Sequence, residues 1–182
     1  MGGNCRRTEF LRLAKSNEQT LVRCARRLCG GDWDRAADCV QEAIVSAYKA
    51  FESGKFQDDE NFRPWIMRIL MNAFLLDERR RRRSVVSEDV TSLVESRQNP
   101  KEAQPEDLLL DGLFSEEVEL ALSTLAPEQL ACVTLVDVES MDYAEAARTL
   151  DIPIGTVRSR LARARLKLAN EILRHRQGAV DL

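Results

Sequence analysis

The sequence has few of the residues on which β-sheet proteins depend. Aromatic residues make up only 5% of its 182 residues, and it contains eight Gly and five Pro. A β-sandwich or barrel needs more β-branched and aromatic residues, and a turn every few positions. Leu, Ala, Arg and Glu are abundant instead, and these residues favour helices. We therefore expect an all-α protein.

Residues that carry enzyme or metal chemistry are also scarce. The five Cys include no Cys-x-x-Cys pair and His175 is the only histidine, so the spacing of a zinc site is absent. No Ser-His-Asp set, phosphate-binding loop or Gly-x-Gly-x-x-Gly occurs. We expect no enzymatic activity, no metal and no cofactor. The cysteines are interpreted as small buried apolar residues or tolerated surface thiols.

Long apolar runs are missing as well. No stretch approaches the ~18 residues that a membrane span needs, and no signal-peptide pattern opens the sequence. The opening residues, Met1–Arg6, lack the Ser or Thr at position six that myristoylation requires. We therefore expect a cytoplasmic protein with no direct membrane insertion.

Charge is unevenly distributed along the sequence. The net charge of −3 argues by itself against nucleic-acid binding. However, Arg79–Arg83 is an uninterrupted run, residues 84–120 hold ten acids against two bases, and residues 153–176 hold seven bases against Glu171 alone. Because electrostatic attraction acts patch by patch, two basic segments around an acidic one predict contact with a polyanion.

Hydrophobic periodicity predicts two helical blocks. In the first, a helix over 9–29 ends at Gly30-Gly31, a second opens at Asp34, and a third begins near Pro64. The apolar stripes expected to be buried are Val40, Ile44, Ala47 and Phe51 in the second helix, and Trp65, Ile69, Ala73 and Leu76 in the third.

The second block is expected to hold four helices near 116–125, 127–139, 142–150 and 153–175, with a capping box at Asp142–Glu145. Periodicity fades between the blocks. We predict two small helical domains, residues 1–83 and 113–182, joined by a flexible acidic linker over 84–112.

The last two helices, with a tight connection at Asp151–Ile154, predict a helix-turn-helix. Val157, Leu161, Ala164 and Leu168 form an inward stripe, and five cations project elsewhere: Arg158, Arg160, Arg163, Arg165 and Lys167. A recognition helix contacts base edges with its N-terminal residues while other cations neutralise phosphates. The alternative interpretation is a solvated basic helix, but the preceding helix and turn favour DNA binding.

The arginine run and the loop before the third helix give a second indication. Consecutive arginines point all around a helix, which suits phosphates passing close by; the alternative is a solubilising helix end. Lys55-Phe56 places an aromatic ring beside a cation, a pair that can stack an unpaired base. A lone Phe in a loop also serves as a lid over a core.

Four segments resemble the extracytoplasmic-function (ECF, group 4) sigma factors of the sigma-70 family. Asp34–Tyr48 resembles the region 2.2 pattern D-x-V-Q-E-x-F-x-x-A-Y/W, and Phe62–Asp77 resembles the W-L-x-x-I-x-x-N-x-x-x-D helix of regions 2.3 and 2.4. Leu125–Leu130 and the helix-turn-helix with Ile154–Arg160 resemble region 4. Together these segments cover about residues 9–168.

The resemblance implies a sigma factor that binds core RNA polymerase, directs promoter-specific initiation and is controlled by an anti-sigma factor. Asp38, Gln41 and Glu42 would dock on the β′ clamp helices, with the β subunit as a further contact. The residues implied at the −10 element are Phe56, Arg68, Asn72, Arg79 and Arg80, with Asn72 and Phe56 capturing a flipped base. The residues implied at the −35 element are Tyr143, Thr156, Arg158, Ser159, Arg160 and Arg163.

Two other functions remain alternatives. A dimeric helix-turn-helix regulator acting on an operator would bind DNA without polymerase and at two half-sites. The region 2 resemblance argues against it, because such a regulator has no need of that region. An adaptor that binds polymerase but not promoter DNA predicts that Arg158 and Arg163 can change without effect.

Overall fold

The computed structural model describes residues 2–56, 61–87 and 116–178, and this part of the chain is helical and contains no strand. The helices are α1 (Gly2–Leu28), α2 (Trp33–Glu52), α3 (Phe62–Ser87), α5 (Glu116–Ser123), α6 (Pro127–Val133), η1 (Thr134–Val138), α7 (Tyr143–Leu150) and α8 (Ile154–Gly178). The all-α prediction is confirmed. No helix in the described ranges is long and apolar enough to cross a bilayer.

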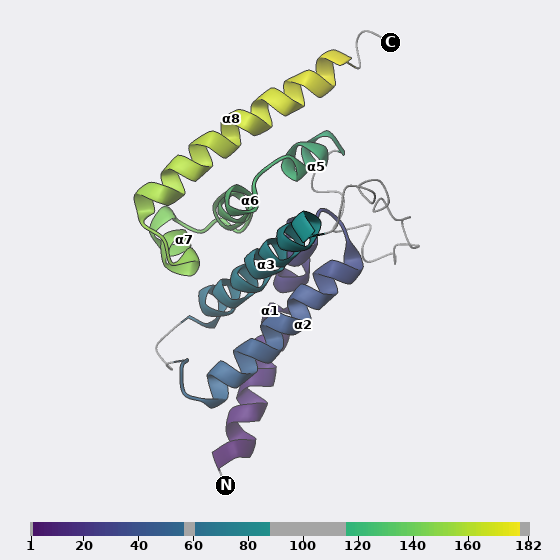
Figure 1. The fold of residues 1–182 in the computed structure, drawn as a ribbon. Coiled ribbons are helices and arrows are strands. Elements are labelled where there is room, and N and C mark those ends of the chain that lie inside the picture. The colour runs from purple at the N-terminus through teal and green to yellow at the C-terminus, as the bar shows by residue number, and fades with distance from the viewer. Residues whose placement is uncertain (1, 57–60, 88–115, 179–182) are drawn as a thin grey trace.

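The helices form two groups that touch. α1, α2 and α3 pack on one another, and α8 packs across α5, α6 and α7 (Figure 1). α3 also contacts α6 and α7, and α1 contacts α6 and η1. From residue 88 onward, the predicted linker lies outside the described residues, and the predicted domain boundaries stay predictions.

The turn between α1 and α2 depends on two glycines and an aspartate. Gly30 and Gly31 have φ of 65° and 83°, in the left-handed region that side chains disfavour. The carboxylate of Asp32 then accepts a hydrogen bond from the Arg35 backbone N–H at 3.0 Å and caps α2. The predicted helix stop is confirmed, but the cap is Asp32 and not Asp34.

The buried face of α2 differs in part from the predicted stripe. Ala47 and Phe51 are buried as expected, whereas Val40 and Ile44 are only partly buried. The remaining buried residues of α2 are Ala36, Cys39 and Ala43. These small side chains allow neighbouring helices to approach α2 closely, so the packed face is marked by small residues that a search for large apolar ones passes over.

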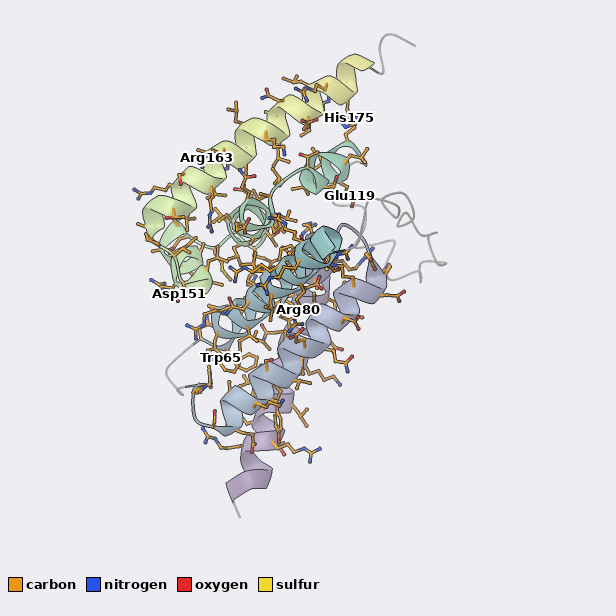
Figure 2. All side chains as sticks on the ribbon, in the orientation of Figure 1. Trp65, Arg80, Glu119, Asp151, Arg163 and His175 are labelled. Atoms are coloured by element: carbon orange, nitrogen blue, oxygen red, sulfur yellow. The ribbon has the colours of Figure 1, made fainter. Side chains whose placement is uncertain are left out.

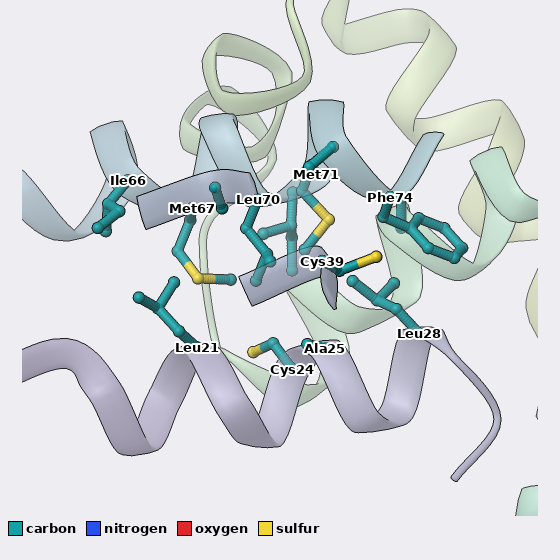
Figure 3. Packing of buried hydrophobic residues seen from close by; sticks show 14 of the residues in the cluster. Leu21, Cys24, Ala25, Leu28, Cys39, Ile66, Met67, Leu70, Met71 and Phe74 are labelled. Atoms are coloured by element: carbon teal, nitrogen blue, oxygen red, sulfur yellow. The ribbon is translucent and has the colours of Figure 1, made fainter. Parts of the chain in front are cut away.

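α3 is covered by both groups of helices. In the predicted stripe Trp65 and Ala73 are buried, Ile69 is partly buried and Leu76 is 39% exposed. The most deeply buried positions are Ile66, Met67, Leu70, Met71 and Phe74 (Figure 3). The predicted stripe therefore lies at the edge of the buried surface of α3, not at its centre. A single stripe is expected when one face is covered, and here α3 packs against α1, α2, α6 and α7.

The segment predicted as one helix over 127–139 changes its winding at Thr134. α6 ends at Val133 and η1 continues as a π-helix. The Glu139 N–H donates to the Thr134 carbonyl at 3.0 Å, five residues back. Ser140 then takes a φ of 57°, which turns the chain toward α7.

Candidate nucleic-acid interface

Local caps shape the helix-turn-helix formed by α7 and α8. Asp142 accepts a hydrogen bond from the Glu145 N–H at 2.7 Å, which caps the start of α7 and is one of the two bonds of the predicted capping box. Asp151 ends α7 in the left-handed conformation, with φ of 53°. The Pro153 carbonyl accepts from the Thr156 N–H at 2.8 Å and opens α8. The predicted helix-turn-helix is confirmed.

α8 separates an apolar face from a basic one. Val157, Leu161 and Ala164 are at most 1% exposed, and Leu168 packs against the same core, as predicted. Of the residues predicted to contact the −35 element, Arg158, Ser159 and Arg163 are exposed, and Tyr143, Thr156 and Arg160 are half-buried. Figure 2 shows Arg163 on α8, near its N-terminal half.

Some of these side chains also bond within the protein. The Ser159 hydroxyl donates to the Thr156 carbonyl at 3.0 Å. The Arg165 guanidinium donates to the Asp137 carboxylate at 3.2 Å and to the Tyr143 hydroxyl at 3.5 Å. The hydrogen bonds to Asp137 and Tyr143 raise the pKa of Arg165. Arg165 therefore braces α8 against η1 and positions the Tyr143 hydroxyl.

Arg160 differs from its neighbours Arg158 and Arg163 because it faces the protein. Burial raises the pKa of the Cys132 thiol in α6, and the guanidinium of Arg160 opposes this rise by its charge and a hydrogen bond. Arg158 and Arg163 are exposed, so their cations are open to an external anion. Arg160 therefore contacts the protein interior, whereas Arg158 and Arg163 point outward.

A second basic surface follows α3. Arg79–Arg83 and Asn72 are exposed, and Arg68 is half-buried. Arg80 lies 3.8 Å from the carboxylate of Glu42 on α2, measured from Nη1 to Oε2, and is labelled in Figure 2. Arg80, one of the predicted −10 residues, is therefore adjacent to the predicted polymerase-binding face of α2.

The predicted polymerase-binding residues share one outer face of α2. Asp38, Gln41 and Glu42 are all exposed, whereas the adjacent residues Cys39 and Ala43 are buried. Spacing of three and four residues places side chains side by side on a helix. This face therefore presents two carboxylates and an amide to a partner.

Phe56 does not lie at the surface as a base-stacking ring would. It is 7% exposed and stacks on Phe51, with ring centroids 5.3 Å apart. Its centroid is also 5.6 Å from that of Phe62 and 5.0 Å from that of Trp65. This placement agrees with the lid interpretation of the loop. Stacking of an extruded base on Phe56 would require the ring to leave this cluster, and that role stays a prediction.

Sequence reasoning missed the arginines that pair across the fold. Arg35 bonds to Asp77, 42 positions away, and Glu139 accepts from Arg63 and Arg23, which lie 76 and 116 positions away. Helical spacing rules connect residues three or four positions apart. No signal within one sequence could have found these longer pairings.

The described cysteines take the place predicted for small apolar residues. Cys24, Cys29, Cys39 and Cys132 are free thiols in the core. The side chain of Cys5 lies outside the described part. Among the residues the structure describes, no three His, Cys, Asp or Glu side chains are grouped so that they could hold a metal ion.

Comparison with known proteins decides the family. The family model Sigma-70 region 2 matches residues 13–85, and the model Sigma-70, region 4 matches residues 115–168. The ECF RNA polymerase sigma-E factor of Escherichia coli (strain K12) is 34% identical over 143 residues, which are 74% of this chain and 72% of that protein. The chain belongs to the ECF sigma factors of the sigma-70 family.

Other relatives agree. The ECF RNA polymerase sigma factor SigE of Mycolicibacterium smegmatis is 31% identical over 166 residues, 90% of this chain but only 61% of SigE, so the chain spans less than two thirds of that relative. The sigma factor RpoE in complex with the anti-sigma factor NepR from Bartonella quintana superposes with a TM-score of 0.67 and 26% identity, covering 92% of this chain and 96% of RpoE. CnrH in complex with the cytosolic domain of CnrY shares the fold, with a TM-score of 0.60, 24% identity, and coverage of 90% and 87%.

The two matched regions of this ECF factor correspond to the two groups of helices. Region 2 spans most of α1, all of α2 and α3 up to residue 85, and region 4 spans α5, α6, η1, α7 and α8 up to residue 168. Every predicted polymerase and −10 residue lies in region 2, and every predicted −35 residue lies in region 4. The roles of the individual residues stay predictions.

Proposed function

We propose that this ECF factor binds core RNA polymerase, directs it to initiate at particular promoters, and is controlled by an anti-sigma factor. One observation carries the proposal: an exposed basic recognition helix in region 4 and an exposed basic helix in region 2 occur in the same chain. A regulator that binds an operator through its helix-turn-helix has no use for the second surface.

Region 4 would bind the −35 element as duplex. Arg158 and Arg163 are exposed near the N-terminal end of α8, the end from which recognition helices contact base edges. A single bidentate contact to a base discriminates by ~1–3 kcal/mol. Arg160, which faces Cys132, would act by supporting the helix and would contact DNA only after turning outward.

Region 2 would bind the −10 element and support strand separation. Unstacking costs a few kcal/mol per base step, and capture of an extruded base offsets part of this cost. Asn72 is exposed on α3, one helical turn from Arg68, and Arg79–Arg83 continue the same helix toward its end. Asn72 would hold the extruded base, and the basic residues Arg68 and Arg79–Arg83 would follow the DNA backbone.

Core polymerase would dock on Asp38, Gln41 and Glu42 of α2 through the β′ clamp helices, with the β subunit as a further contact. The net charge of −3 gives the chain little long-range attraction to DNA on its own. A specificity subunit can tolerate this charge, because the polymerase supplies most of the attraction to phosphates.

The anti-sigma factor would bind between the two regions. A cavity of about 590 Å³ lies among α1, α3, α5 and α6. Leu28, Leu122 and Leu130 line it together with Arg27 and Arg82. An apolar surface bordered by arginines suits an amphipathic acidic helix. The similarity to RpoE, whose structure is a complex with the anti-sigma factor NepR, supports a partner of this kind.

The experiment combines the purified chain with bacterial core polymerase and genomic fragments, followed by sequencing of the transcripts. We expect new start sites that share upstream −35 and −10 elements, and we expect Asn72→Ala and Arg163→Ala to abolish them. Arg174→Ala is the control, because Arg174 is exposed near the end of α8, away from the predicted contacts. Absence of polymerase binding, together with tight binding of the free protein to duplex, would support the operator regulator instead.

A further inference from the structure

Glu139 stands out among the charged residues that the described mechanism leaves unused. It lies between η1 and α7, and its side chain is 1% exposed. Arg23 on α1 donates to one carboxylate oxygen at 3.2 Å, and Arg63 at the start of α3 donates to the other at 2.6 Å. Both arginines belong to region 2, whereas Glu139 belongs to region 4.

The neighbours of Glu139 from each packed element favour its charged form. Burial alone would raise the pKa of Glu139, but hydrogen bonds from Cys24 and the two arginines, with their charges, hold it below its usual range. Arg27 on α1 adds a further favourable charge. A buried carboxylate is costly unless each of its oxygens is compensated. Among the described residues, the hydrogen bonds that compensate Glu139 come across the contact between the two regions, from Cys24, Arg23 and Arg63.

The ion pairs lie within a wider interface. α3 contacts α6 and α7, and α1 contacts α6 and η1 (Figure 1). The buried apolar residues of the two regions form one continuous cluster. The two regions are thus held in direct contact, an arrangement that we call the closed form.

The closed form is incompatible with simultaneous contact to both promoter elements. The names of the elements place them about 25 base pairs apart, roughly 85 Å along duplex at ~3.4 Å per base pair. A domain of roughly 80 residues has a radius of gyration of only ~12 Å. With Arg63 and Glu139 2.6 Å apart, regions 2 and 4 cannot span that distance.

We propose that Glu139 is an interdomain latch: its ion pairs with Arg23 and Arg63 hold region 4 on region 2 in a closed resting form, and their release is a step in activation. The proposal rests on the proposed function in one respect, since activation here means promoter-specific initiation with core polymerase. The latch itself is a property of the free chain, and it acts on promoter binding through the position of region 4.

The test uses the full-length chain without polymerase. Small-angle scattering gives its overall dimensions, and hydrogen exchange reports protection of α3, which the closed form covers. We expect a compact wild type, and Glu139→Gln and Arg63→Gln variants with a roughly tenfold or larger increase in the open fraction. Asp137→Asn is the matched control, because Asp137 is in the same segment but pairs with Arg165 inside region 4.

A second variant and a second measurement keep the test decisive if Glu139→Gln fails to fold. Should Glu139→Gln lose helical circular dichroism, Arg63→Gln decides, since the Arg63 side chain is 45% exposed and lies outside region 4. Wild-type dimensions and exchange in Arg63→Gln and Arg23→Gln, or an extended wild type, would overturn the latch. Transcription with core polymerase is scored separately: its failure in the wild type counts against the proposed function and leaves the scattering result intact.

Discussion

Arg35 on α2 donates from Nε to the Oδ2 of Asp77 on α3 at 2.7 Å, and the same guanidinium reaches Glu78. The Arg35 side chain is only 16% exposed. Burial alone would lower the pKa of Arg35, but the hydrogen bonds to Asp77 and Glu78 raise it. This arginine therefore ties α2 to α3 within region 2, independently of region 4.

Asp77→Asn is expected to lower the free energy of unfolding by about 1–2 kcal/mol, because it removes a charge-assisted bond to a mostly buried cation. Urea unfolding followed by circular dichroism measures the loss. Glu42→Gln is the control: Glu42 and Arg80 are 3.8 Å apart and largely exposed, so we expect a loss below about 0.5 kcal/mol. Equal losses in the two variants would contradict this ranking.

Ser140→Gly is expected to stabilise the chain. Ser140 has a φ of 57° without being a glycine, and relief of that strain should raise the free energy of unfolding by about 0.5–1 kcal/mol. Gly30→Ala should do the reverse, by about 1 kcal/mol, because Gly30 has a φ of 65°. Thermal unfolding of the three proteins checks both signs. A destabilised Ser140→Gly would show that the turn is held by its side chain.

The helices were predictable where their signals are local. Gly30-Gly31, Asp142 and Pro153 each act within one or two turns of the chain, and the structure ends or begins a helix beside each of them. The inward stripe of α8 was predictable for the same reason, because one face of that helix packs on α5, α6 and α7. Exposure of Arg158 and Arg163 follows from that stripe.

Features set by distant parts of the chain were not predictable. The stripe predicted for α3 lies at the edge of its buried surface, because α6 and α7 also cover this helix. Both helices come after residue 126, and no local sequence pattern indicates their contact with α3. The placement of Phe56 follows from three other rings, and that of Glu139 from arginines on two other helices. The functional roles came from motif resemblance, since exposure alone does not say which anion or protein a surface binds.

Glu139 is expected to make stability depend on pH at the acid end. Its folded pKa lies below its unfolded value of about 4.3, so its stabilising contribution is complete above pH ~5 and is lost as the pH falls through the folded pKa. Glu139→Gln cannot titrate at this position. The difference in free energy of unfolding between wild type and variant should therefore shrink as the pH falls below ~5.

Urea unfolding at a series of pH values measures this difference. Asp137→Asn provides the comparison, because its partner Arg165 is 47% exposed and the pair lies outside the region 2 contact. A difference for Glu139→Gln that stays constant or grows on acidification would contradict a lowered folded pKa.

Substitutions of Phe56 distinguish a packing role from a base-stacking role. Phe56→Ala is expected to lower the free energy of unfolding by about 3 kcal/mol, because the ring is 7% exposed among other aromatic rings. Phe56→Leu keeps most of the apolar volume and should cost less than about 1.5 kcal/mol. Urea unfolding gives both values, and open-complex formation with core polymerase is measured for the same proteins.

The leucine variant decides between the two roles. If Phe56 acts as a lid, Phe56→Leu should retain near-wild-type opening of a duplex promoter, because the loop stays seated on Phe51 and Trp65. If the ring leaves the cluster to stack an extruded base, Phe56→Leu should stay folded yet lose opening, since leucine offers no flat π-face. A promoter already unpaired at the −10 element would then restore part of the activity, because the melting step no longer needs help.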